Sequence, residues 1–71
     1  MHTVELLAQA LRVAERLGYR VRQEWLETGG GVCEFNGRRW LFIDLAQSAI
    51  EQYALVREVI ADAQQSDRQA A

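Results

Sequence analysis

The Asn36-Gly37 pair is the feature that most limits the fold of this chain, because strand-forming residues flank it on both sides. A two-residue type I′ turn needs positive φ at both central positions, and asparagine and glycine adopt that conformation at the least cost. We therefore predict a β-hairpin whose strands run from Val32 to Phe35 and from Arg38 to Asp44.

This turn also fixes which residues of the two strands lie opposite each other. It places Phe35 opposite Arg38, Glu34 opposite Arg39, Cys33 opposite Trp40 and Val32 opposite Leu41, and each pair shares one face. One face then carries Cys33, Phe35, Trp40 and Phe42, and the other carries Val32, Leu41 and Ile43. Both faces are apolar, so we expect that helices cover one of them and that part of the other is open to solvent or to another molecule.

Periodicity predicts the remaining elements. Apolar residues at helical spacing indicate a helix from about Thr3 to Leu17, with Thr3 as its N-cap and Gly18 just past its end. Alternation with a period of two indicates a strand from Tyr19 to Leu26. The stretch Ser48-Ala-Ile-Glu51 matches a capping box and predicts the start of a second helix.

The expected fold class is α+β, in the order α-β-β-β-α, with a three-stranded antiparallel meander and two helices packed on one face. The 71 residues are expected to form a single small domain, 1–71, with a polar C-terminal tail from about 64 to 71. A domain of this size has a thin core, and association with itself or a partner is a reasonable expectation.

Charge and composition limit the kinds of partner. The net charge is −2, and no basic cluster extends beyond Arg38-Arg39, so nucleic acid is not expected as a partner. The longest apolar run is too short to span a membrane, and no membrane partner is expected. The single cysteine cannot form an internal disulfide and fits a cytoplasmic location.

The order of elements resembles the front portion of the ImmA/IrrE-like zinc metallopeptidases over about residues 11–63. The residues that carry this likeness are Leu17-Gly18-Tyr19, the glycine-rich hairpin, Trp40-Leu-Phe-Ile-Asp44 and Gln52-Tyr53-Ala54-Leu55. In that family the final helix carries a His-Glu-x-x-His motif that binds zinc. The matching positions here are Arg57, Glu58 and Ala61, so the resemblance implies the fold without the metal ligands or the peptidase activity. No metal or cofactor is expected.

Three local features are candidates for a site. Cys33 could act as a nucleophile or redox sensor, but its expected cross-strand neighbour Trp40 supplies no base, and a small apolar role is favoured. Arg38 and Arg39 could bind an anion, although pairing of Arg39 with Glu34 and stacking of Arg38 on Phe35 is the simpler interpretation. Glycines 29–31 precede a strand, which favours a loop connection over a phosphate site.

These observations favour a non-enzymatic interaction module that self-associates or docks a protein partner through the sheet face that the helices leave uncovered. The candidate anchors are Val32, Leu41 and Ile43 on one face, or Cys33, Trp40 and Phe42 on the other. A small enzyme or thiol sensor centred on Cys33, with Glu34, Arg39 or Glu58 as helpers, is the alternative. The sequence does not identify a small-molecule ligand.

Overall fold

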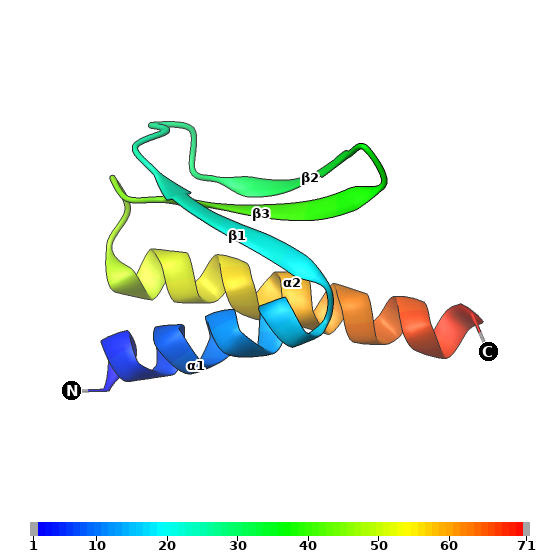
Figure 1. Cartoon of the computed structure of the whole chain (residues 1–71). Coiled ribbons are helices and arrows are strands. Elements are labelled where there is room, and N and C mark those ends of the chain that lie inside the picture. Colours follow the sequence, from blue (N-terminus) through cyan, green and yellow to red (C-terminus); the bar gives the residue numbers. More distant parts are fainter. Residues whose placement is uncertain (1, 71) are drawn as a thin grey trace.

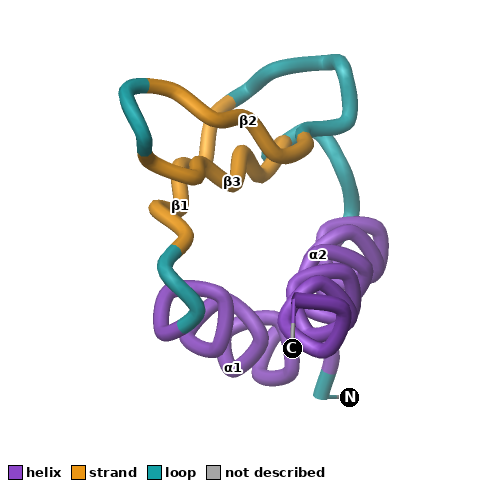
Figure 2. Tube along the Cα trace, turned by 90° about the vertical axis from the view of Figure 1, so that its right-hand side faces the viewer, coloured by secondary structure: helices purple, strands orange, loops and turns teal. Residues whose placement is uncertain are grey.

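The computed structural model describes the backbone of residues 2–70 and the side chains of residues 2–65. The elements follow the predicted order, α-β-β-β-α, and confirm the α+β class. They are α1 (Thr3–Arg16), β1 (Tyr19–Glu24), β2 (Gly31–Phe35), β3 (Arg38–Asp44) and α2 (Ala49–Ala70). Both helices lie on the same side of the sheet, so the molecule has two layers (Figure 1 and Figure 2).

The sheet is mixed, and the predicted antiparallel meander is wrong for β1. The strand order is β1-β3-β2, with β1 parallel to β3 and β2 antiparallel to it. The reason lies in β3, which is apolar on both faces and so takes the central position, where it has a neighbour on each side. The more polar β1, with Arg20 and Arg22, takes an edge.

The hairpin itself matches the prediction. Asn36 and Gly37 both have positive φ, at 53° and 74°, as a type I′ turn requires. The register pairs Cys33 with Trp40 and also contains the other three predicted pairs, Val32 with Leu41, Glu34 with Arg39 and Phe35 with Arg38. The faces assigned to these residues from the sequence are therefore correct.

The loop of residues 25–30 crosses the end of β3 to connect β1 with β2, and Asp44 holds it in place. The Asp44 carboxylate accepts hydrogen bonds from the backbone amides of Leu26 and Gly29 in this loop and of Ala46 beyond β3. Gly30 has a φ of +73° and passes so close to β3 that a Cβ there would lie 2.3 Å from the Phe42 carbonyl oxygen. The crossing thus depends on one carboxylate and one glycine.

The core lies between the helices and the sheet. Leu41 and Ile43 of β3 are completely buried there, and Val56 of α2 and Ala14 of α1 are buried against the same cluster. Val32, on the same face of β2, stays 49% exposed because the helix layer does not extend far enough to cover it. β2 is the strand farthest from both helices (Figure 1 and Figure 2).

The helix ends agree with the sequence in most respects. Thr3 is the first residue of α1 and not its N-cap, because the first helical bond runs from the Leu6 amide to the His2 carbonyl. Gly18 follows the helix with a φ of +101°, as predicted. The capping box forms, since Ser48 and Glu51 bond to each other's backbone amides. The polar stretch expected as a tail continues α2 through residue 70, and Ala71 lies outside the described residues.

Candidate functional site

The sheet face that points away from the helices, called here the open face, is the main candidate site. Leu41 and Ile43 point into the core and have no exposed surface, so they are not available for contact in the folded protomer. The residues that alternate with them on β3, Trp40 and Phe42, are half-buried on the open face. The structure therefore brings together one of the two predicted anchor sets, Cys33, Trp40 and Phe42, with Phe35 beside it.

The open face contains a hollow, and half of the residues that line it are aromatic. The rings of Trp40 and Phe42 stack with their centroids 6.2 Å apart and an angle of 18° between their planes. The hollow has a volume of about 320 Å³, and Phe35, which lines it from β2, is 64% exposed. Its lining residues come from all three strands and are Arg22, Glu24, Cys33, Phe35, Trp40 and Phe42.

The charges around this hollow are mainly positive. Because residues in register share a face, Arg20 lies beside Trp40 and Arg22 beside Phe42, and Arg38 lies beside Phe35. Glu24 is the acidic residue with exposed surface on this face, and it forms an ion pair with Arg22. The open face therefore combines an apolar centre with a surplus of arginine, in a chain whose net charge is negative.

The two arginines predicted as anion-binding candidates do not converge. Arg38 and Arg39 are neighbours on a strand, so their side chains point to opposite faces of the sheet. The Arg39 guanidinium lies over the Tyr19 ring, 5.7 Å from its centroid, at the edge of the helix-covered face. Glu34 lies opposite Arg39 in the register, but the ion pairs among the described side chains are formed by other residues.

Cys33 is exposed at the middle of β2. Its thiol contacts the Glu34 carbonyl oxygen at 3.7 Å, and it lines the hollow together with Arg22 and Glu24, which are paired with each other. A thiol in this position can be reached by reagents from solvent. Its cross-strand neighbour is Trp40, as predicted, and an indole ring cannot act as a base.

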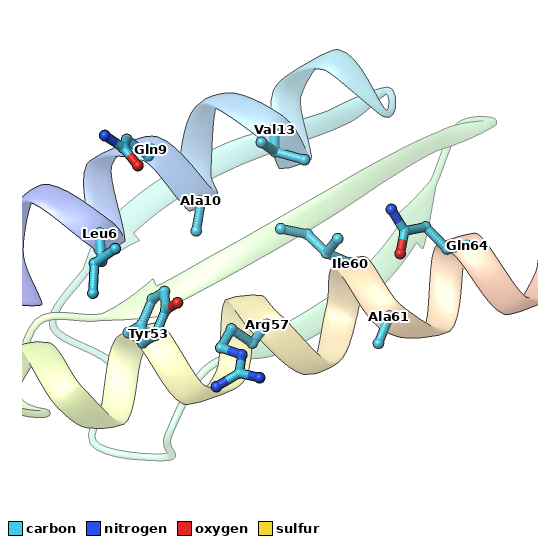
Figure 3. Close-up of a pocket in the computed structure, with 9 residues that line it drawn as sticks. All are labelled: Leu6, Gln9, Ala10, Val13, Tyr53, Arg57, Ile60, Ala61 and Gln64. Atoms are coloured by element: carbon cyan, nitrogen blue, oxygen red, sulfur yellow. The ribbon is translucent and has the colours of Figure 1, made fainter.

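A groove separate from the hollow on the open face runs between α1 and α2 (Figure 3). Leu6 and Val13 of α1 face Tyr53 and Ile60 of α2 across it, and Arg57 stacks over the Tyr53 ring at 5.8 Å. The positions that correspond to the metallopeptidase motif are Arg57, Glu58 and Ala61, of which only Glu58 matches it, and all three are exposed on α2. Within the described residues, no three His, Cys, Asp or Glu side chains gather as they would around a metal ion.

The sequence did not reveal two contributors to this architecture. The sequence predicts Asp44 only as the end of a strand, because two of its hydrogen-bond donors come from a loop whose path depends on the strand order. The sequence predicts Gly31 in a loop connection, whereas in the structure it is the first residue of β2 and lies opposite Phe42. The Gly-rich composition was the available signal, since glycine often marks a close backbone approach.

Neither helix of the described chain is long and apolar enough to cross a membrane. No protein-family model, curated protein or solved structure matches the chain. The resemblance to ImmA/IrrE-like metallopeptidases accordingly stays a prediction from the sequence.

Proposed function

We propose that the protein is a non-enzymatic interaction module that docks a protein partner on its open face. The observation that supports this function is the exposure of Phe35 and the half-exposure of Trp40 and Phe42 on a sheet face that neither helix covers. Aromatic side chains of this kind are the usual anchors of protein interfaces, because each buries a large apolar area at a low cost in side-chain entropy.

The charge of the open face defines the chemistry of the partner. Three arginines, Arg20, Arg22 and Arg38, surround the aromatic centre, and Glu24 already pairs with Arg22. A partner segment that presents apolar side chains flanked by Asp or Glu complements this pattern, whereas a second copy stacked through the same face would bring arginines together. We place this interaction in the cytoplasm, where the lone Cys33 stays reduced.

A displayed library of random peptides tests the proposal without a known partner. The library is selected on the native protein and then on the variant Trp40→Glu, which puts a charge in the centre of the open face. We expect enriched peptides that combine large apolar residues with Asp or Glu and that lose at least about tenfold in affinity for the variant.

Trp25→Glu is the matched control, because Trp25 is 73% exposed in the loop that follows β1. Peptides that bind this control as well as the native protein support the open face as the docking surface. Enriched peptides that bind Trp40→Glu as tightly as the native protein contradict the proposal, and so does a selection that enriches nothing.

The exposure of Cys33 favours the alternative function, a thiol sensor, in one respect, since a sensor thiol must be reachable. Alkylation separates the two functions. A sensor predicts rapid labelling of the native protein by iodoacetamide at mildly acidic pH, because its thiolate would be stabilised. The interaction module predicts that labelling at this pH is no faster than that of a free cysteine peptide.

A further inference from the structure

The two edges of the sheet differ in their protection against pairing with another strand. β1 carries Arg20 and Arg22, and charged side chains on an edge strand disfavour pairing with other chains. β2 has one charged residue, Glu34, and no proline, and its register with β3 is continuous, without a bulge. β2 also lies farthest from the helices (Figure 2). The β2 edge is therefore open to strand addition.

The hairpin geometry shows which backbone groups point outward from β2. In a two-residue hairpin, the residues that flank the turn exchange backbone hydrogen bonds, and such pairs alternate with non-hydrogen-bonded pairs along the ladder. Phe35, Cys33 and Gly31 therefore bond to β3, and the amide and carbonyl groups of Val32 and Glu34 point away from it. These two residues lie on either side of Cys33, which is the middle of the strand.

The two ends of β2 complement each other in shape. Phe35, at one end, projects from the open face with 64% of its surface exposed. Gly31, at the other end and on the same face, has no side chain, and a hollow opens over it. This hollow is lined by Leu26, Thr28, Gly30, Gly31, Val32, Cys33 and Phe42.

We propose that two copies of this chain pair through β2, antiparallel, about a two-fold axis at Cys33. The pairing joins the two three-stranded sheets into one of six strands. Val32 of each copy then lies opposite Glu34 of the other, so that all four outward-pointing residues exchange backbone hydrogen bonds. Phe35 of each copy lies opposite Gly31 of the other and fills the hollow beside Phe42.

This pairing closes on itself and continues the open faces of both copies. A two-fold axis leaves only the arginine-bearing β1 edges at the outside of the sheet, so the assembly stops at two copies. The strands β3 and β2 separate the arginines of β1 from the two-fold axis, so this pairing does not bring the β1 arginines of the two copies together. The pairing uses the β2 edge and the Phe35 side chain, whereas Arg22 and Trp40 of the open face are left for a partner.

Sedimentation velocity of the full chain over a range of concentrations tests the pairing, with Glu34→Pro and Glu34→Ala as a matched pair of variants. Proline removes the outward amide of Glu34 without removing a bond to β3, whereas alanine keeps that amide. We expect a dimer for the native chain and for Glu34→Ala, and a self-association about tenfold or more weaker for Glu34→Pro. A native chain that stays monomeric at all concentrations overturns the proposal.

Phe35→Ala provides a second variant in case proline prevents folding. Its control is Val4→Ala, which truncates a side chain of similar exposure on α1, in the other layer. We expect Phe35→Ala to weaken the dimer and Val4→Ala to leave it unchanged, and a dimer that tolerates Phe35→Ala overturns the inference.

Trp40→Glu should leave the dimer intact, since Trp40 lies on β3. A dimer lost in Trp40→Glu shows face-to-face association and contradicts pairing through β2.

Cys33 provides a direct readout of the register. At the proposed axis the two Cys33 residues form a non-hydrogen-bonded pair with their Cα atoms about 4.5 Å apart, within the range that a disulfide spans. With an added copper-phenanthroline oxidant we expect rapid formation of a disulfide-linked dimer. The double variant Cys33→Ala, Arg20→Cys moves the thiol to the β1 edge and should form a linked dimer much more slowly. Equal rates for the two proteins contradict the proposed register.

Discussion

The Asp44 carboxylate accepts a hydrogen bond of 2.9 Å from the backbone amide of Gly29, and this contact ties the loop between β1 and β2 to the end of β3. The same carboxylate accepts a second bond of 2.9 Å from the amide of Ala46, where the chain leaves β3. Asp44 is 1% exposed. One buried carboxylate thus fixes both the entry of the chain into β2 and its exit toward α2.

Replacement of Asp44 by alanine should lower the melting temperature more than any comparable change of a surface carboxylate. The substitution leaves the amides of Leu26, Gly29 and Ala46 without their acceptor in a region closed to much of the solvent. Asp62→Ala is the control, because Asp62 is exposed on α2. Circular dichroism melts provide the measurement, and equal melting temperatures for the two variants contradict this role of Asp44.

Stability should fall in acid, and Asp44 and Glu51 are responsible for part of this dependence. Hydrogen bonds from the amides of Ala46 and Gly29 lower the pKa of Asp44 below its ordinary value of 3.8, and bonds from the Ser48 amide and hydroxyl lower the pKa of Glu51 below 4.5. The unfolded chain therefore binds these protons more readily than the folded one. Their stabilisation is complete above the ordinary values and is lost as the pH falls through the folded-state values.

Urea denaturation between neutral pH and about pH 3 measures this dependence through the free energy of unfolding. The variant Asp44→Asn should lose less stability than the native protein over the acidic part of this range, because it has one fewer carboxylate to protonate. A free energy of unfolding that rises as the pH falls below 4.5 contradicts the lowered pKa values of these two carboxylates.

A comparison of Gly30→Ala with Gly37→Ala separates the cost of backbone strain from the cost of steric overlap. Their φ angles are almost the same, +73° and +74°, so alanine is similarly strained at both positions. Only at Gly30 does the added Cβ meet backbone, at 2.3 Å from the Phe42 carbonyl oxygen, whereas nothing lies within 4 Å of a Cβ at Gly37. We expect Gly30→Ala to cost about 1–3 kcal/mol more in the free energy of unfolding than Gly37→Ala. Equal losses contradict the close crossing.

Much of the fold can be predicted from local signals in the sequence. The turn at Asn36-Gly37, the glycine after α1 and the capping box at Ser48 each act over a few residues, and the structure contains all three. The cross-strand pairs followed from the turn alone. These features need no knowledge of tertiary packing, and for that reason they could be predicted.

The position of β1 and the choice of the open face could not be predicted in this way. The pairing of β1 with β3 depends on the path of the loop and on the bonds that Asp44 makes to it, which join residues 15 and 18 positions apart. Both faces of the hairpin are apolar in the sequence, so the sequence alone does not show which face the helices cover. In the structure, Leu41 and Ile43 pack in the core formed with α1 and α2 and determine that face.

A charge should be tolerated on the open face and not in the core. Leu41 is completely buried, so Leu41→Glu places a carboxylate without a partner among apolar side chains, at a cost of several kcal/mol. Such a cost is comparable with the entire stability expected of a domain this small. We expect Leu41→Glu to be unfolded and Trp40→Glu to be folded, as measured by amide proton dispersion in NMR spectra. An unfolded Trp40→Glu would show that Trp40 belongs to the core.

The central claim, that the open face is the docking surface, is tested most directly by mapping a selected peptide onto the protein through amide chemical shifts. The prediction is that the largest shifts on addition of the peptide fall on the strand residues of the open face, Arg22, Cys33, Phe35, Trp40 and Phe42. The competing surface is the groove between α1 and α2, lined in part by Leu6, Tyr53 and Ile60. Shifts confined to that groove, with the strand residues unchanged, would contradict the claim.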